Sequence, residues 1–302
     1  MASLYPDDAD LETAMPDPLT TDPVPTAGPP ARTEPVTFDS HGSTLLGVLH
    51  VPAGAGPHPI VVLLHGIPGN ERNFDLAHAL SRAGYATLVF HYRGSWGVAG
   101  SWSWTHVLED TALVVTRLRE PGTADRFRLA PDRLAVIGHS LGGFAALMTA
   151  AADEQVRAVG SIAGFDFGAA VAACRTDPAR RAAYADAWDG ELLPLRDTSG
   201  KALVAEMERA GDAWSLVRLA PRLAGRPVLL VGAGRDEDVT PPAVHHDPLV
   251  RAYAAHRARL EHHVFPADHA LSDHRVALAR TAVGFLDRHL RRDPGTAPGH
   301  RR

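Results

Sequence analysis

One serine of this chain stands in the sequence context of a catalytic nucleophile. Ser140 is the centre of the run Gly-His-Ser-Leu-Gly, which follows a short apolar segment at 134–137 and precedes an Ala-rich segment with helical character. A strand, a Gly-x-Ser-x-Gly turn and a helix in this order form a nucleophile elbow, which strains the serine backbone and holds the hydroxyl clear of the sheet. Glycine on both sides of the serine lets the strand and the helix approach closely. The pattern predicts that Ser140 is a nucleophile.

A serine nucleophile makes two demands on the rest of the chain. Its hydroxyl needs a histidine to take the proton, and an acid must orient that histidine. In the fold that carries this elbow, the three residues follow one another in the order serine, acid, histidine. Asp236 lies after the apolar run 228–231, and His269 lies in the loop after the apolar run 260–265. Both positions agree with this order, so we expect Ser140, Asp236 and His269 to form a catalytic triad.

The acid and the base both have neighbours of the same type. Asp236 comes first after its strand and precedes a valine and a proline, so we favour it over Asp238, which remains the alternative. The other histidines near His269 in the sequence are His262, His263 and His274. The first two are adjacent in a strand, so at most one of them can point toward any site. The third is expected to begin the final helix.

Acyl transfer also requires donors for the oxyanion that develops in the transition state. The backbone N–H of Leu141, at the start of the helix after the elbow, is one expected donor. The second is expected from the loop that follows the apolar run 60–64. Gly66 allows this loop to turn tightly and Ile67 N–H can then point at the substrate, whereas Pro68 has no N–H to donate. We therefore expect Ile67 and Leu141 to form the oxyanion hole.

Short apolar runs alternate with helical patterns through the middle of the chain. Helical spacing between most of these runs, as at 73–83 and 107–119, predicts a mainly parallel sheet with helices on both faces. The expected fold class is therefore α/β. The strands are expected at 36–39, 44–51, 60–64, 86–91, 134–137, 156–162, 228–231 and 260–265.

The alternation stops between residues 165 and 226, where no convincing strand occurs. This stretch is too long for a plain loop, so it predicts a helical cap inserted above the strand ends. The core is then expected to comprise residues 35–164 and 227–292. Helices of the cap are expected at 178–187, 201–209 and 213–219.

The two ends of the chain are expected to lie outside this fold. Residues 1–34 are rich in aspartate and proline and contain almost no bulky apolar side chains, so we expect a disordered, solvated tail there. Contact of this acidic segment with a partner protein is the alternative. Residues 293–302 are expected to form a short flexible tail.

Composition argues against several other classes of protein. The chain has 302 residues, a net charge of −5 and 22% charged residues, which is typical of a globular protein with no affinity for nucleic acid or an anionic membrane. The sole cysteine, Cys174, excludes an intramolecular disulfide and suits a reducing compartment. No membrane-spanning run and no signal peptide is evident, so we expect a cytoplasmic location. The sequence contains no signal for a particular oligomeric state.

The motifs together resemble the α/β-hydrolase superfamily over about residues 35–290. The resemblance rests on His65-Gly66, the elbow at Ser140, Asp236 and His269. Further runs resemble the hydrolases related to dipeptidyl aminopeptidases and acylaminoacyl peptidases, although the usual Gly/Ser-rich continuation after Gly97 is here Val-Ala-Gly. These runs are His-Tyr-Arg-Gly-Ser-Trp-Gly at 91–97, Ser-Trp-Ser-Trp at 101–104 and Leu-Glu-Asp at 108–110. The resemblance implies an α/β-hydrolase fold and a serine hydrolase that needs no metal or organic cofactor.

Several residues near the expected strand ends are candidates for a substrate pocket. Arg93 could hold a substrate carboxylate or clamp the loop to Asp110, and the aromatic residues could line an apolar pocket or join the cap to the core. The run His245-His246-Asp247 lacks the spacing and the further ligand of a metal site, so no metal is expected. The expected pocket residues are His65, Arg93, Trp96, Trp102, His139, Phe165 and Trp188.

These residues predict an enzyme that cleaves a carboxylic ester of a small molecule through an acyl-enzyme intermediate. One alternative keeps hydrolysis but replaces the ester by an amide, a peptide or a thioester, as in an aminopeptidase-like enzyme. The other is a non-hydrolytic cyclase or lyase of a biosynthetic pathway, which uses the histidine as acid and base. In each case the expected partner is a small molecule, an ester or amide in the hydrolases.

Overall fold

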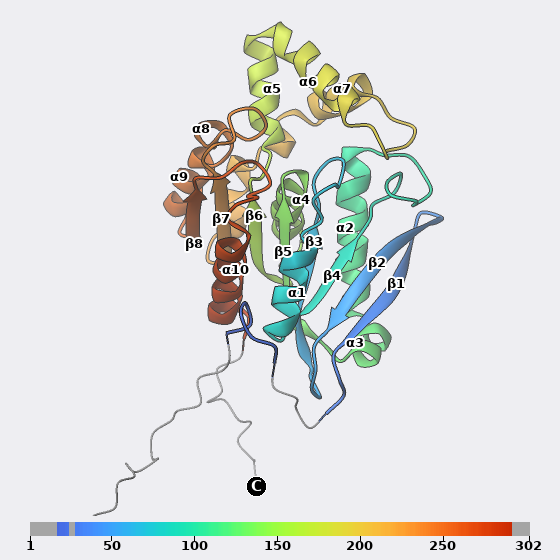
Figure 1. Ribbon diagram of the computed structural model, residues 1–302. Helices are drawn as coiled ribbons and strands as arrows, with labels where there is room; N and C mark the ends of the chain where they lie inside the picture. Colours follow the sequence, from blue (N-terminus) through green and yellow to red (C-terminus); the bar gives the residue numbers. More distant parts are fainter. Residues whose placement is uncertain (1–16, 24–27, 292–302) are drawn as a thin grey trace, which may run out of the picture.

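A mostly parallel sheet of eight strands, covered by helices on both faces, forms the centre of the protein (Figure 1). The computed structural model describes residues 17–23 and 28–291. The strands are β1 (Arg32–Ser40), β2 (Ser43–Val51), β3 (His58–Leu64), β4 (Ala86–Phe90), β5 (Leu129–His139), β6 (Val156–Ile162), β7 (Pro227–Ala233) and β8 (Arg259–Phe265). Their order in the sheet is β1-β2-β4-β3-β5-β6-β7-β8. β2 pairs antiparallel with β1 and β4, and all other pairs are parallel, so the expected α/β class is confirmed.

Helices of the core pack against both faces of the sheet. They are α1 (Phe74–Arg82), α2 (Trp104–Arg119), α3 (Pro121–Phe127), α4 (Leu141–Ala152), α8 (Pro242–His245), α9 (Asp247–Ala255) and α10 (Arg275–His289). α1 and α10 cover one face, where Leu80 and Leu278 are fully buried. α2, α4 and α9 cover the other face, around Val114 and Phe144. Central strands such as β3 are buried along their whole length, which explains their continuous apolar sequence.

A helical insertion separates β6 from β7 and lies above the carboxyl ends of the strands (Figure 1, yellow). It consists of α5 (Phe167–Thr176), α6 (Pro178–Gly190), α7 (Gly200–Ala210) and the 3-10 helices η1 (Gly211–Trp214) and η2 (Val217–Leu223). The helical cap expected from the missing strand pattern is confirmed. The single helix expected at 213–219 is wrong, because Leu216 N–H donates to the Asp166 carboxylate at 3.1 Å and the helix breaks there.

The N-terminal segment contributes more to the fold than its composition predicts. β1 begins at Arg32, within the expected tail, because its backbone pairs with β2 whatever the polarity of its side chains. Residues 17–20 form a turn that contacts the core: Arg82 Nε donates to the Pro18 carbonyl at 2.7 Å, and Leu19 packs against the apolar cluster to which α1 and α10 contribute. The tail boundary expected at residue 34 is therefore wrong. The remainder of the expected tails, residues 1–16, 24–27 and 293–302, lies outside the described residues.

Arg93 connects the loop after β4 to α2 through a buried ion pair. Its backbone N–H and its Nε both donate to Asp110 at 2.7 Å, and Ser40 Oγ donates to the same carboxylate at 2.6 Å. The Asp110 side chain has no exposed surface, while the Arg93 guanidinium also reaches the half-exposed carboxylate of Glu109. Arg93 is thus a structural clamp, which is one of the two roles expected for it.

No helix in the described part of the chain is long and apolar enough to cross a membrane.

The clamp between Arg93 and Asp110 leads to a prediction about stability. Replacing Asp110 by alanine leaves the buried Arg93 guanidinium without its main partner, so the free energy of unfolding should fall by about 3–5 kcal/mol. Glu109→Gln, on the exposed side of the same arginine, should cost less than about 1 kcal/mol. Urea denaturation followed by circular dichroism measures both values. Equal losses in the two variants would contradict the assignment of the clamp to Asp110.

Candidate active site

The turn between β5 and α4 holds Ser140 in a strained backbone conformation, with φ 57° and ψ −120°. A non-glycine residue adopts such angles only where the surrounding structure enforces them. Here the enforcement comes from close packing, because a Cβ at Gly138 would overlap the Gly142 carbonyl and a Cβ at Gly142 would overlap the Leu64 carbonyl. The expected order of strand, strained serine turn and helix is present.

His269 forms a hydrogen bond with Asp236 in the loops that follow β8 and β7. The distance between His269 Nδ1 and Asp236 Oδ2 is 2.6 Å. Thr240 Oγ1 donates to the same oxygen at 2.5 Å, and the N–H groups of Val239 and Thr240 donate to the carboxylate at 3.0 and 2.9 Å. Burial by itself would raise the pKa of Asp236, but these hydrogen bonds outweigh it and hold the pKa well below its ordinary value. Asp236 is therefore an ionised, buried partner of His269.

The alternative aspartate and histidines that are close in sequence to Asp236 and His269 form no hydrogen bond with this pair. Asp238 is exposed and its carboxylate has no bond to His269, so Asp236 is the carboxylate of this turn that contacts the imidazole. His262 and His263 lie on the exposed edge strand β8. His274 precedes α10 and bonds to Asp273.

His139 holds the backbone of the loop that carries His269. Its Nε2 lies 2.8 Å from the His269 carbonyl oxygen, which can only accept, so His139 donates through Nε2. Burial, followed by the nearby His269, lowers the pKa of His139 to about 3. His139 is therefore neutral at physiological pH, and it positions the neighbouring imidazole without adding a charge beside it.

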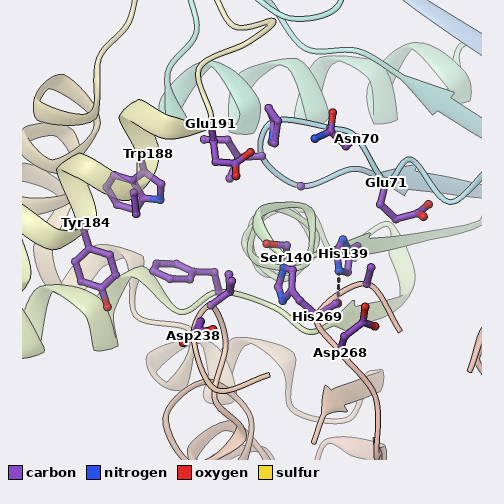
Figure 2. A pocket seen from close by; sticks show the side chains of 18 residues that line it. Asn70, Glu71, His139, Ser140, Tyr184, Trp188, Glu191, Asp238, Asp268 and His269 are labelled. Carbon is purple, nitrogen blue, oxygen red and sulfur yellow. Dashed lines mark hydrogen bonds between the residues drawn. The ribbon is translucent and has the colours of Figure 1, made fainter. Parts of the chain in front are cut away.

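A cavity of about 480 Å³ opens between the core and the cap at this point. Ser140 and His269 lie at its centre, and both side chains face the same space (Figure 2). Of the pocket residues expected from the sequence, His139, Phe165 and Trp188 line it. The loop Gly66–Gly69 forms one wall and α6 of the cap forms another.

Four other expected pocket residues do not line this cavity, and each has a structural reason. Arg93 forms the clamp with Asp110. Trp102 is 2% exposed and packs edge-on against two buried aromatic rings of the core. The indole N–H of Trp96 donates to the Pro68 carbonyl at 2.7 Å, so this side chain supports the loop from behind.

His65, the fourth of these residues, lies beneath the loop and fixes its first peptide. Its Nδ1 donates to the Gly66 carbonyl at 2.8 Å, and its Nε2 faces His91 Nδ1 at 3.4 Å. Burial lowers the pKa of His65 to about 3 and that of His91 to about 4. A Cβ at Gly66 would lie 2.9 Å from Ser140 Cβ, so this loop packs directly against the serine. His65 therefore positions the loop rather than the substrate.

The two expected oxyanion donors flank Ser140. Leu141 is the first residue of α4, where backbone N–H groups have no partner within the helix. Ile67 lies in the loop beside Ser140 and lines the cavity. Neither N–H donates to another residue in the described part of the chain, so both are free to bind an oxygen of a ligand.

The sequence did not reveal several residues of the cavity wall. Tyr184 and Glu191 line it together with Trp188, and the three lie along one side of α6 and its end. The spacing of Tyr184 and Trp188, one helical turn apart, is the signal from which the aromatic face of this helix could have been found. Asp238, expected only as an alternative triad acid, also lines the cavity.

The run that superficially suggested a metal has a structural role instead. His245 stacks on Phe165 with ring centres 4.7 Å apart, and its Nδ1 accepts the Asp166 N–H at 3.0 Å. His246 is buried at the start of α9. Within residues 17–23 and 28–291, no cluster of three or more His, Cys, Asp or Glu side chains could hold a metal ion. Cys174 is a half-buried free thiol in α5.

Comparisons with known proteins identify the family and the fold of the chain. The model of the alpha/beta hydrolase family matches residues 61–281, more than half of the chain. Esterase EstD of Thermotoga maritima is 30% identical over 148 residues, which are 44% of this chain and 34% of EstD. More generally, the chain spans between 34% and 55% of the length of the curated relatives it matches.

Solved structures share the fold at low sequence identity. Est1E of Butyrivibrio proteoclasticus, solved with bound ferulic acid, matches with a TM-score of 0.65 at 20% identity, over 84% of this chain and 98% of Est1E. The acylaminoacyl peptidase of Pyrococcus horikoshii also gives a TM-score of 0.65, at 16% identity, over 89% of this chain and 43% of the peptidase. Both matches extend beyond the sheet to most of the described chain.

The hydrogen bond between Asp236 and His269 predicts which acid matters. Asp236→Asn should lower the turnover of a neutral ester by about 10³–10⁴-fold, because an asparagine no longer holds the imidazole in the required tautomer. The loss of turnover in Asp238→Asn should be smaller than this by at least about a hundredfold, because Asp238 has no bond to the imidazole. Steady-state hydrolysis of a p-nitrophenyl ester measures both. A larger loss of turnover in Asp238→Asn than in Asp236→Asn would assign the orienting role to Asp238.

The buried histidines predict a loss of stability in acid. The folded-state pKa of His65 is about 3, below the ordinary value of about 6.5. Between these values the unfolded chain binds a proton that the folded chain excludes. The stability that this residue contributes is therefore complete above about pH 6.5 and is lost as the pH falls toward 3, by about 2 kcal/mol at pH 5.

The measurement is the pH dependence of the free energy of unfolding between about pH 5 and pH 6. His65→Asn keeps a donor near the Gly66 carbonyl but removes the titrating group, so the slope should decrease by roughly one proton. Gln155→Asn, an exposed substitution that changes no titrating group, is the control and should leave the slope as it is. If His65→Asn leaves the slope of the unfolding free energy against pH unchanged, the folded protein does not exclude a proton from His65.

Proposed function

Because the chain belongs to the alpha/beta hydrolase family, we propose that it is a serine hydrolase that cleaves a carboxylic ester of a small molecule through an acyl-enzyme intermediate. Ser140 is the nucleophile, His269 is the base and Asp236 orients that base. The observation that carries the proposal is the 2.6 Å hydrogen bond between Asp236 and His269, beside a serine held at a strained elbow in the same cavity.

The tautomer of His269 follows from its partner. An ionised carboxylate only accepts hydrogen bonds, so Nδ1 of the neutral imidazole carries the hydrogen and Nε2 carries the lone pair. In the proposed first step, Ser140 Oγ attacks the acyl carbon and its proton passes to His269 Nε2. The resulting imidazolium then gives this proton to the leaving alkoxide, and Ser140 keeps the acyl group. Attack by water, with the same base, releases the acid and restores the serine.

The N–H groups of Ile67 and Leu141 are proposed to bind the oxyanion in both steps. A single donor of this kind contributes about 10²–10³-fold to turnover. Rigid support of the loop makes such a contribution possible, because donors held in place need no reorganisation when the charge develops. The hydrogen bond of His65 to the Gly66 carbonyl and that of Trp96 to the Pro68 carbonyl provide this support.

An ester is favoured over an amide by the name of one curated relative. EstD is named an esterase, and its identity to this chain is the highest among the curated relatives that match. The likeness to an acylaminoacyl peptidase concerns the fold, and amide hydrolysis is therefore the second candidate. The proposed chemistry uses side chains and backbone groups of the chain alone. A cytoplasmic location is also proposed, supported by the free thiol of Cys174.

A fluorophosphonate probe tests the nucleophile directly, because it reacts with an activated serine. We expect labelling of the wild type at Ser140 and none of Ser140→Ala, with circular dichroism showing that the variant is folded. An ester series of increasing acyl length, measured beside aminoacyl p-nitroanilides, tests the bond. Hydrolysis of at least one ester should exceed that of every anilide. Absence of labelling in the wild type would defeat the serine mechanism, and faster anilide hydrolysis would replace the ester by an amide.

A further inference from the structure

Three aromatic side chains form one end of the cavity, which we call the aromatic wall (Phe165, Tyr184 and Trp188). The rings of Tyr184 and Trp188 are stacked, with centres 5.5 Å apart and planes 22° apart. Phe165 packs edge-on against both, at 6.0 and 6.3 Å. All three line the cavity, and Figure 2 shows Tyr184 and Trp188 on one side of it with Ser140 near its middle. The wall therefore presents aromatic surface to a molecule bound at the serine.

Two carboxylates that line the cavity beside the aromatic wall have no partner among the residues that the structure describes. Glu191 follows α6, and Asp238 belongs to the loop after β7; Figure 2 shows them at opposite edges of the cavity. Neither side chain forms a hydrogen bond or an ion pair with another residue that the structure describes. The other two acids of the lining are different, because Glu71 lies 3.8 Å from Arg275 and Asp268 bonds to Ser272.

The acidic side chains therefore give the lining of the cavity a negative charge. Among its described lining residues none is lysine or arginine, and His139 is neutral because burial lowers its pKa to about 3. Carboxylates that line one cleft concentrate their field there and raise the local concentration of cations. The faces of tyrosine and tryptophan attract a cation as well, and an ammonium group without N–H donors depends mainly on such faces.

From this combination we propose that the substrate of the cavity carries an ammonium group, protonated or quaternary, which binds between the aromatic wall and the carboxylates of Asp238 and Glu191. The proposal rests on the proposed function in that the ester of the same molecule lies at Ser140. It assigns a charge to the substrate, which the family alone does not. An anionic ester should be a poor substrate for the same reason.

The test compares choline with its neutral carbon isostere, 3,3-dimethylbutan-1-ol, which has the same shape without the charge. Binding is measured by ligand-observed NMR, which does not depend on catalysis, and by protection of Ser140 from a fluorophosphonate probe. At low salt the wild type should bind choline at least about tenfold more tightly than the isostere. High salt should reduce this ratio, because the carboxylates are exposed to solvent.

Variants identify the groups responsible for the preference. The double variant Asp238→Asn, Glu191→Gln should lower the ratio several-fold, and Trp188→Leu should lower it by removing an aromatic face. Glu237→Gln is the matched control, because Glu237 is exposed, neighbours Asp238 and does not line the cavity. It should keep the ratio of the wild type.

The outcomes separate the two proposals. Equal binding of choline and its isostere, or a ratio that the double variant retains, overturns the ammonium site, and labelling of Ser140 would then leave the hydrolase intact. A preference for choline in a protein whose Ser140 is not labelled would support the ammonium site and overturn the serine mechanism. A loss of the ratio in Glu237→Gln equal to that in the double variant would show a general charge effect and would also overturn the site.

Discussion

The active site depends on how closely α4 approaches the carboxyl ends of β3 and β5. Gly138 and Gly142 leave no room for a side chain at this contact, because a Cβ at either would overlap a neighbouring carbonyl. The same contact forces Ser140 into its strained conformation and brings the Gly66 loop against it. The free N–H of Leu141 is a further consequence, since α4 begins there. The positions that a base and an oxyanion donor must occupy follow from this one packing constraint.

Buried, uncharged histidines hold two loops of the site in place. His139 fixes the carbonyl of His269, and His65 fixes the carbonyl of Gly66. Burial lowers the pKa of both supporting rings, so neither adds a positive charge next to Ser140 and His269. Asp236 is then the one buried charge that bonds to His269. The low dielectric that keeps the supporting histidines neutral also strengthens the hydrogen bonds they make.

The core and the cap have separate tasks in this arrangement. The core provides Ser140, the bonded pair Asp236 and His269, and the proposed backbone donors, all at one edge of the sheet. The cap provides most of the aromatic wall, through Tyr184 and Trp188, and one of its two charged neighbours, Glu191. Substitutions on α6 would therefore change the lining of the cavity while Ser140 and His269 stay in place.

Local signals in the sequence predicted the sheet, the cap and the elbow, because glycine turns and apolar periodicity report backbone geometry directly. They favoured Asp236 but left Asp238 as the alternative, since both belong to one polar turn and only the folded loop buries the first against His269. They also assigned Trp96 and Trp102 to the pocket, because an aromatic residue type is equally suited to a core. Which of these roles a side chain has depends on residues far away in the chain, and folding alone brings those residues together.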